Sequence, residues 1–324
     1  MKLHLFNPEN DLALACGSAN FTPPKSVVEF RTALAALPIW IAQPGDNIIA
    51  PELDAQWLRQ TGTEVGLNIE GTPSPWGWSE NAAWQFRRLG IDGPYPNLDY
   101  LRQLSHRRTS ISLYNHLSAS NLPYSLPPAP REITSAEELP DTDLIMLKSP
   151  WSCSGRGVID CQGLTSSIIR RRAEESIRRQ GSVMVESKLN KARDFAMLFE
   201  GGKYKGLSLF ITNGTSYTGN IVAPENELAA MLGASCLAET AKAIEQWLPT
   251  DYDGPMGVDM MLLEDGNICP CVEINVRKTM GFVAHALANR FGKGEFHIAA
   301  RPKHIPNGAF HLVPKNSNFA AYLI

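Results

Sequence analysis

The sequence predicts an α/β fold with more than one structural unit, and three observations lead to this prediction. The chain has 324 residues, which corresponds to two domains of ~150 residues. Hydrophobic residues make up 44% and charged residues 19% of the chain. This balance is typical of globular proteins and excludes a wholly disordered or fibrous one. Strand and helix patterns alternate along the first hundred residues, which favours a parallel sheet.

The N-terminal elements follow from hydrophobic spacing and from residues that begin or end helices. In order, we expect a strand at 3–7, a helix from Pro24 to Leu37, a strand at 38–42 and a helix at 54–62. This alternation predicts a parallel, Rossmann-like layer, and the absence of GxGxxG gives no indication of a dinucleotide ligand. The segment 71–97 is rich in Pro, Gly and Trp, so we expect a loop and linker with a short helix at 79–89.

A second unit begins near residue 105. The expected helices are 97–104, 109–119, 164–180, 225–248 and 280–292, and the expected strands are 144–148, 182–186, 195–200, 205–212 and 216–223. The segment 254–277 contains two strand patterns around the turn residues EDGN, and therefore predicts a β-hairpin.

The second strand of this hairpin carries three polar side chains on one face. Because side chains alternate along a strand, Glu273, Asn275 and Arg277 point to the same side. Asp259 lies on the partner strand. Carboxylates and an amide oxygen are hard ligands suited to Mg²⁺, and a guanidinium beside them could neutralise a phosphoryl group in transfer. The alternative is a solvated outer face of the hairpin.

The hairpin turn decides whether Asp259 joins this face. A two-residue turn at Asp265-Gly266 would turn Asp259 away from Glu273. A three- or five-residue loop, or a bulge, would place the two carboxylates side by side, where a divalent cation removes the cost of their like charges. We therefore expect such a loop or bulge, with Gly266 or Asn267 in the left-handed conformation.

A Ser/Gly-rich loop, SPWSCSGRGV, follows the expected strand LIMLK, which ends at Lys148. The free N–H groups of such a loop can wrap phosphates, and Arg156 adds positive charge. The loop lacks the GxxxxGK[ST] pattern of a P-loop. Ser/Gly loops are also common connectors, so this feature alone does not decide the function.

Together these features resemble the ATP-grasp superfamily from residue 105 to 292. The shared features are a strand-end Lys, the SGRGV loop, a strand-end Glu, a D…E-x-N hairpin and an Arg two residues later. The resemblance implies an α/β protein with a Rossmann-like N-terminal domain followed by a two-lobed ATP-grasp fold. Its parts would be a substrate-side domain at 1–104, a small lobe with the Gly-rich loop at 105–186, and a large lobe with the metal-binding hairpin at 187–324.

The resemblance also implies a binding site for ATP. Lys148 would hold the α- and β-phosphates, and Arg107, with Arg108 as the alternative, would supply an earlier phosphate contact. Asp194 falls near the position of the ribose-binding acid, where Glu is commoner. The implied nucleotide-binding residues are Arg107, Lys148, Ser154, Gly155, Arg156, Gly157, Glu186, Leu189 and Asp194.

By the same resemblance, Asp259, Glu273 and Asn275 would hold two Mg²⁺ ions, and the catalytic residues would be Arg277, Lys148 and Arg156. The implied activity is ATP- and Mg²⁺-dependent ligation of a carboxylate to an amine through an acyl phosphate. The alternatives are an ATP-grasp phosphotransferase that releases a phosphorylated product, and a non-catalytic nucleotide-binding protein. The sequence does not name the carboxylate, the amine or the oligomeric state.

Charge and hydropathy restrict the classes of binding partner that we expect. The net charge of −3 gives no reason to expect nucleic acid, and the Arg-rich segment 170–180 is expected to be a solvated helix face with Glu–Arg pairs four residues apart. No apolar run reaches the ~18 residues of a membrane helix, and the N-terminus does not resemble a signal peptide. We therefore expect a cytoplasmic protein that acts on small molecules, without a membrane partner.

Two further groups of residues allow two interpretations. For Trp76, Trp78 and Trp84, packing is favoured over a substrate pocket. Polar side chains also follow the first expected strand, at the sheet edge where ligands bind in open α/β sheets. They could hold a substrate amine or cap the next segment, and they are Glu9, Asn10 and Asp11.

Overall fold

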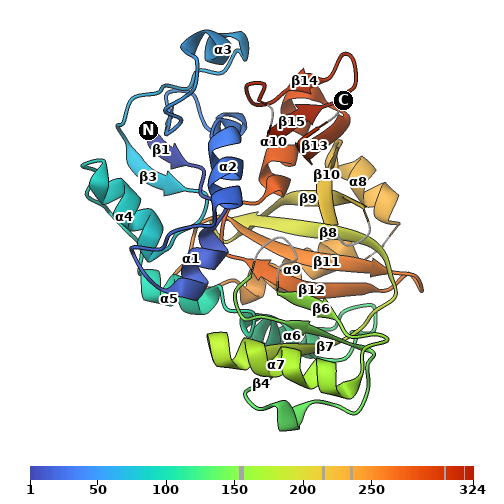
Figure 1. Ribbon diagram of the computed structural model, residues 1–324. Helices are drawn as coiled ribbons and strands as arrows, with labels where there is room; N and C mark the ends of the chain where they lie inside the picture. Colours follow the sequence, from blue (N-terminus) through green and yellow to red (C-terminus); the bar gives the residue numbers. More distant parts are fainter. Residues whose placement is uncertain (153–156, 214–215, 234–235, 303, 317) are drawn as a thin grey trace.

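The structure, a computed structural model, describes residues 1–152, 157–213, 216–233, 236–302, 304–316 and 318–324. The described strands form three sheets, of three, eight and four strands, which confirms the mixed α/β class. Figure 1 shows the eight-stranded sheet crossing the molecule, with the N-terminal sheet to one side and the four-stranded sheet below. No helix within the described ranges is long and apolar enough to cross a membrane.

The N-terminal sheet is parallel and has the strand order β2-β1-β3. Its elements, in chain order, are β1 (Lys2–Leu5), α1 (Asn10–Cys16), α2 (Lys25–Ala33), the 3₁₀ helix η1 (Leu37–Trp40), β2 (Asn47–Ile48), α3 (Ala55–Gln60) and β3 (Thr72–Pro75). The alternation of strands and helices therefore does produce a parallel sheet, because a helical connection carries the chain back to the same end of the sheet before each new strand begins.

Two sequence predictions are wrong in this region. The apolar run at 38–42 is not a strand, because residues Leu37–Trp40 form η1 and are fully buried. Pro38 fixes the start of that 3₁₀ turn and has no N–H for a strand ladder. The segment 71–97 is not a loop at its start, because Thr72–Pro75 forms β3. Its two prolines are tolerated because β3 is an edge strand.

Three helices connect this region to the rest of the chain, and all three were expected from the sequence. They are α4 (Glu80–Arg88), α5 (Leu98–Leu104) and α6 (Thr109–Ala119). The side chain of Ser79 caps α4 by accepting from Ala82 N, and Asn97 caps α5 by accepting from Tyr100 N. Each cap satisfies an N–H that the helix leaves unpaired, so both helices begin where the sequence places a capping residue.

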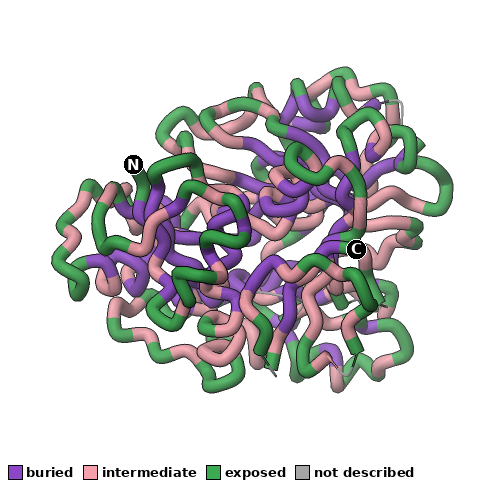
Figure 2. Tube along the Cα trace, turned by 90° about the horizontal axis from the view of Figure 1, so that it is seen from above, coloured by how far each residue is buried: buried purple, intermediate pink, exposed green. Residues whose placement is uncertain are grey.

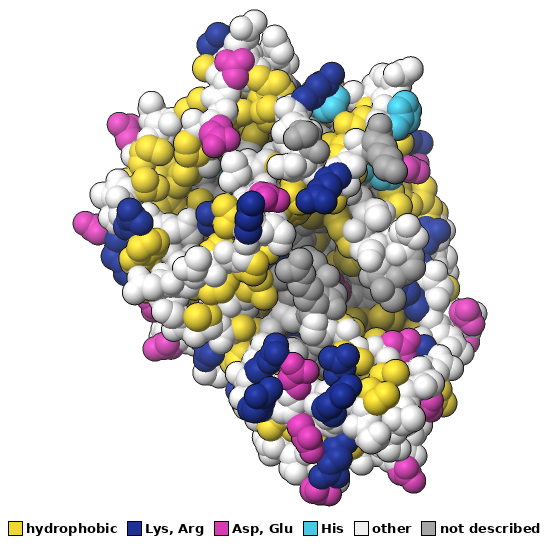
Figure 3. Space-filling view, viewed as in Figure 1, with side chains coloured by type: hydrophobic (Ala, Val, Ile, Leu, Met, Phe, Trp, Pro, Cys, Tyr) yellow, Lys and Arg dark blue, Asp and Glu magenta, His cyan; other side chains and the backbone are white. Residues whose placement is uncertain are grey.

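The four-stranded antiparallel sheet has the order β4-β7-β5-β6 and is packed against α7. Its elements are β4 (Arg131–Ile133), η2 (Ala136–Glu138), β5 (Ile145–Lys148), β6 (Val158–Asp160), α7 (Ser166–Gln180) and β7 (Val183–Ser187). Figure 3 shows the basic side chains gathered low on this face of the molecule, with acidic ones between them.

Three of the five arginines of α7 pair with glutamates of the same helix. Glu175 pairs with Arg179 at 2.6 Å, as the four-residue spacing predicts. Glu174 pairs at 3.1 Å with Arg170, four residues before it, and not with Arg178, four residues after it, which the sequence also offers as a partner. Both partners lie four residues from Glu174, so spacing alone does not distinguish them.

The eight-stranded sheet has the order β12-β11-β8-β9-β10-β13-β15-β14. Its strands are β8 (Lys191–Glu200), β9 (Lys203–Asn213), β10 (Ser216–Val222), β11 (Met256–Leu263), β12 (Ile268–Asn275), β13 (Gly294–Ala300), β14 (Phe310–His311) and β15 (Phe319–Leu323). The strands after residue 292 were not anticipated.

The helices associated with the eight-stranded sheet are α8 (Glu225–Leu232), α9 (Leu237–Trp247) and α10 (Met280–Phe291). The single helix expected at 225–248 is wrong, because Gly233 ends α8 in the left-handed conformation with φ +64°.

The N-terminal sheet shares a hydrophobic core with the far end of the chain. Phe6 and Leu37 belong to the same cluster as Val283 of α10 and Phe296 of β13. The indole of Trp40 also donates to the carbonyl of Leu312 at 2.7 Å. Figure 2 shows buried chain running through both halves of the molecule. The N-terminal region is therefore held against the large sheet by packing as well as by the polar contacts described below.

Candidate active site

The hairpin of β11 and β12 brings the two predicted carboxylates face to face. Asp259 is the direct cross-strand partner of Glu273. The turn is a three-residue loop, closed by Leu263 N donating to Asn267 O at 2.8 Å, and Gly266 has φ +83°. The register also shifts between Asp259 and Met261. The expectation of an odd-length loop or a bulge with a left-handed glycine is therefore confirmed.

Asp259 is half-buried and lies beside a second negative charge, that of Glu273. Burial, followed by the charge of Glu273, raises the pKa of Asp259 to about 7, while Arg277 acts in the opposite direction. The amide of Asn275 donates to Asp259 Oδ2 at 3.1 Å. The described residues contain no group of three or more His, Cys, Asp and Glu side chains that could hold a metal ion. The hairpin instead offers two carboxylates and one amide, which together can bind a hard divalent cation.

Arg107 lies against this hairpin and is buried. Its Nη2 donates to Glu273 Oε1 at 2.6 Å and to Ser152 Oγ at 3.1 Å, and its Nε has no hydrogen-bond partner within the described residues. Arg108 lies 3.7 Å from Glu132 and is half exposed. Of the two arginines that the sequence left open, Arg107 is the one brought to the hairpin.

Lys148 connects the four-stranded sheet to the hairpin. From the end of β5, its Nζ donates to Glu186 Oε2 at 2.5 Å and to the carbonyl oxygen of Val272 at 3.2 Å. The side chain of Lys148 is buried. Lys148, Arg107 and the hairpin carboxylates therefore form one cluster across two sheets.

Of the six remaining nucleotide-binding candidates, three belong to the described residues, namely Gly157, Leu189 and Asp194. Asp194 lies on β8, next to β11, and accepts from Lys191 at 2.5 Å. Leu189 is half-buried in the segment between β7 and β8. Gly157 has φ +81°, and a Cβ there would lie 2.9 Å from Ser149 Oγ, so glycine is required. The other loop candidates lie outside the described residues, namely Ser154, Gly155 and Arg156.

Arg277 joins the hairpin to the N-terminal region. It lies two residues after the end of β12 and forms an isolated bridge with Gly77, just beyond β3. Its guanidinium donates from Nη2 to Asp11 Oδ2 at 2.8 Å and from Nε to the same oxygen at 3.1 Å. The sequence analysis named both residues separately, but no local pattern could have paired side chains 266 positions apart.

Lys278 is a buried residue that sequence reasoning missed. Its Nζ donates to Ser74 Oγ at 2.8 Å, Pro75 O at 2.9 Å and Ser74 O at 3.0 Å, and lies 3.4 Å from His4 Nδ1. Burial lowers the pKa of Lys278 to about 7 and the pKa of His4 to about 4. On its other side, His4 contacts Asp46 Oδ2 at 3.0 Å. A lysine directly after Arg277, which the sequence analysis had singled out, was the available signal.

The polar side chains after β1 form hydrogen bonds to the segment beyond β3 and to α2. The Asn10 amide nitrogen, in the orientation that satisfies its surroundings, donates to Gly77 O at 2.9 Å and Ser79 Oγ at 3.2 Å. Glu9 accepts from Arg31 at 2.6 Å, and burial raises the pKa of Glu9. Neither side chain caps α1.

The three tryptophans pack in the way that the sequence analysis favoured. Trp76 is buried and meets Phe6 edge-on with ring centroids 4.9 Å apart. Trp78 packs against Phe86, with ring centroids 6.0 Å apart. Trp84 lies beneath the guanidinium of Arg88.

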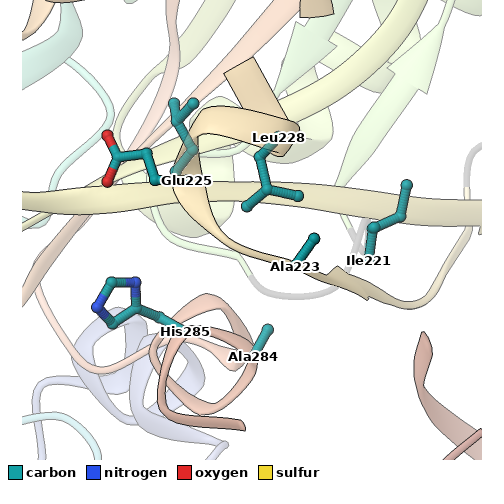
Figure 4. Close-up of a pocket in the computed structure, with 7 residues that line it drawn as sticks. Ile221, Ala223, Glu225, Leu228, Ala284 and His285 are labelled. Atoms are coloured by element: carbon teal, nitrogen blue, oxygen red, sulfur yellow. The ribbon is translucent and has the colours of Figure 1, made fainter. Parts of the chain in front are cut away.

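A small cavity elsewhere in the protein is separate from this cluster. Figure 4 shows Glu225 and His285 at one side of it, among apolar side chains. Its volume of about 10 Å³ is room for a single water molecule. Tyr204 donates to Glu225 at 2.7 Å. This cavity is too small for a substrate.

Comparison with known proteins gives a match only at the level of structure. No family model and no curated protein sequence matches the chain. A biotin carboxylase from Campylobacter jejuni, described as a complex with β-γ-ATP, superposes with a TM-score of 0.57 at 11% identity, covering 100% of this chain and 87% of that one. The N5-carboxyaminoimidazole ribonucleotide synthetase from Thermus thermophilus gives 0.53 at 12% identity, covering 100% and 94%.

A phosphoribosylamine–glycine ligase from Thermotoga maritima gives a TM-score of 0.53 at 12% identity, covering 99% of this chain and 90% of that one. The chain has the ATP-grasp fold. At this level of identity the likeness establishes the fold alone.

Proposed function

We propose that the protein is an ATP- and Mg²⁺-dependent ligase that joins a carboxylate to an amine through an acyl phosphate. One observation carries this proposal: two buried cations contact the hairpin on which Asp259 and Glu273 face each other, Arg107 through Glu273 and Lys148 through the carbonyl oxygen of Val272. Buried ion pairs of this kind are weak contributors to stability, because desolvation offsets most of their attraction. A cluster of cations and acids between two sheets is better suited to binding a polyphosphate and its metal ions.

The cationic side of the cluster fits the phosphates of ATP. Lys148 and Arg107 each bond to a glutamate, Glu186 and Glu273 respectively, which phosphate oxygens would replace as partners. The buried Nε of Arg107 has no hydrogen-bond partner within the described residues, so it could donate to a further phosphate oxygen. Glu186, Leu189 and Asp194 would contact the adenosine, and the loop that includes Arg156 and Gly157 would cover the terminal phosphates.

The acidic side fits magnesium. Asp259, Glu273 and Asn275 would hold two Mg²⁺ ions, since two facing carboxylates with a raised pKa at Asp259 gain most from a cation between them. Bound Mg²⁺ would neutralise negative charge on the phosphates during transfer.

The residues of the chain would act by positioning and by charge. Lys148 and Arg107 would align the triphosphate so that a substrate carboxylate oxygen attacks the γ-phosphorus, and the bond to the β-phosphate oxygen breaks to release ADP. Arg277 would stabilise the negative charge of the transferred phosphoryl group. The amine nitrogen then attacks the acyl carbon, phosphate leaves with the C–O bonding electrons, and the nitrogen loses a proton. No nucleophile of the protein is needed.

The proposed substrate-binding and ATP-binding roles are assigned to the three domains expected from the sequence. Residues 1–104 would form the Rossmann-like, substrate-side domain, with 105–186 as the small lobe and 187–324 as the large lobe. The parallel sheet β2-β1-β3 supports this assignment, because its carboxyl edge meets the hairpin at Gly77 and Arg277.

The test is ADP release by the purified protein with Mg-ATP and a panel of carboxylates, each with and without amines. Hydroxylamine added to the same reactions traps an acyl phosphate as a hydroxamate, and mass spectrometry identifies the product. An amide supports the proposal. A stable phosphorylated product would make the protein a phosphotransferase, and nucleotide binding without turnover would make it a binding protein.

A matched pair of variants ties any activity to this site. Glu273→Gln removes a proposed metal ligand, whereas Glu264→Gln makes the same change at an exposed turn position of the same hairpin. Activity lost in the first variant and retained in the second supports the assigned site. Equal activity in both would refute it.

A further inference from the structure

The guanidinium of Arg277 holds the Asp11 carboxylate in the geometry with which arginine binds an anionic ligand. Two donors of the guanidinium, Nε and Nη2, point at one carboxylate, at 3.1 and 2.8 Å. Arginine binds phosphate with the same planar pair of donors. Asp11 therefore occupies, in the free protein, the side of Arg277 that an anionic group of a substrate would use.

The backbone on both sides of this pair is fixed by other contacts. Asn7 accepts from Trp76 N and donates to Gly77 O, both at 2.8 Å. The backbone N–H of Lys278 donates to Trp76 O, also at 2.8 Å. Because these bonds do not involve the two charged side chains, Asp11 and Arg277 can change partners without movement of the elements that carry them.

The pair is also accessible, unlike its neighbours. The side chains of Asp11 and Arg277 are 14% and 16% exposed, whereas Glu9 and Asn10 are each 1% exposed. Within the part of the chain that the structure describes, every hydrogen bond to the Asp11 carboxylate comes from Arg277. Figure 1 shows α1, which carries Asp11, beside the end of the hairpin strands.

We propose that Asp11 exchanges its partner during the reaction and holds the ammonium group of the amine substrate. This inference rests on the proposed ligase function. When the phosphate of the acyl phosphate takes Arg277, the Asp11 carboxylate loses its cation in a largely buried position, which is unfavourable unless another cation replaces it. A primary aliphatic ammonium supplies that charge and brings its nitrogen next to the acyl phosphate, where it gives one proton to the Asp11 carboxylate before its lone pair attacks the acyl carbon. The amine then binds after the phosphate, and cationic amines are preferred to neutral ones.

The first test measures competition for Arg277. Orthophosphate is titrated by calorimetry into the full-length protein loaded with Mg-ADP. Asp11→Asn keeps the shape of the side chain but removes the competing charge, so we expect phosphate to bind about tenfold more tightly than to the wild type. Arg277→Gln should weaken phosphate binding by at least about tenfold.

The matched control is Asp99→Asn, which removes an exposed carboxylate from the first turn of another short helix, α5. It should leave phosphate affinity unchanged. Asp11→Ser is a second variant with the same expected direction, and thermal melting verifies that each variant is folded. Phosphate affinity that is unchanged or weaker in both Asp11 variants would overturn the exchange.

The second test measures coupling to an amine. The phosphate titration is repeated with ethylammonium chloride and, at equal ionic strength, with sodium chloride. In the wild type, ethylammonium should strengthen phosphate binding, because the two ligands relieve each other's charge, and in Asp11→Asn this effect should vanish. Equal affinities in both salts in the wild type would overturn the ammonium role. Absence of Mg-ADP binding would instead refute the proposed ligase function on which the inference rests.

Discussion

Replacement of Lys278 by Met provides the sharpest test of the contact between the N-terminal sheet and the hairpin. The Lys278 ammonium is buried beneath β3, and burial lowers its pKa from 10.5 to about 7. The positive charge of Lys2 also lowers the pKa of Lys278, and His4, which its amine contacts, has a pKa of about 4. Asp46, beyond His4, has a lowered pKa. Neither His4 nor Asp46 titrates above pH 7, so a change in stability between pH 7 and pH 9 that disappears with the Lys278 amine is due to Lys278.

The expected magnitude follows from proton linkage. Between pH 7 and pH 10.5 the unfolded chain binds a proton at Lys278 that the folded protein has largely lost. The free energy of unfolding therefore rises with pH across this window. With these two pKa values, the rise between pH 7 and pH 9 is about 2 kcal/mol. Lys278→Met removes this contribution, so the destabilisation it causes should be about 2 kcal/mol greater at pH 9 than at pH 7.

The assay is urea unfolding of the wild type and of Lys278→Met at pH 7 and pH 9. Lys203→Met serves as the control, because the side chain of Lys203 is 74% exposed and its loss should add no pH dependence. The three oxygen acceptors around Lys278 Nζ favour the charged form. If the variant and the wild type show the same change between pH 7 and pH 9, those acceptors outweigh burial, and the reasoning is refuted.

Three more changes test the site and its frame. Glu273→Gln should lower ADP release at least about 100-fold with little change in melting temperature, because its side chain faces the site and not the core; a fully active variant would remove Glu273 from the metal set. Lys148→Ala should abolish most of the rise in melting temperature that Mg-ATP gives the wild type, and an unchanged rise would exclude Lys148 as a phosphate ligand. Gly77→Ala should lower the free energy of unfolding by about 2 kcal/mol, because the new Cβ would lie 2.5 Å from the buried Asn10 side chain. Urea unfolding measures this loss, and a neutral result would show that Asn10 can move aside.

The hairpin was predictable from sequence because its information is local. Strict alternation places Glu273 and Asn275 on one face, and the position of Gly266 restricts the turn. The helices with capping residues, such as α4 after Ser79, were predictable for the same reason.

Predictions failed where tertiary contacts decided the local structure. The apolar run Leu37–Trp40 is buried in the core that the two ends of the chain share, and burial does not distinguish a 3₁₀ helix from a strand. Strand β3 was hidden by its prolines, which only its edge position allows. The pairing of Asp11 with Arg277 joins residues from the two ends of the chain, so no sequence window contains both.

Arg277 and Lys278, shortly after β12, also limit how this protein can be recombined with others. Arg277 meets a carboxylate of α1, and Lys278 bonds to oxygens of β3, so the first hundred residues receive two of their polar partners from the hairpin. A chimera that replaces only the N-terminal segment would leave a buried amine without acceptors matched to it. Exchange of substrate specificity between proteins of this architecture therefore requires grafting the dipeptide Arg277-Lys278 together with the N-terminal sheet.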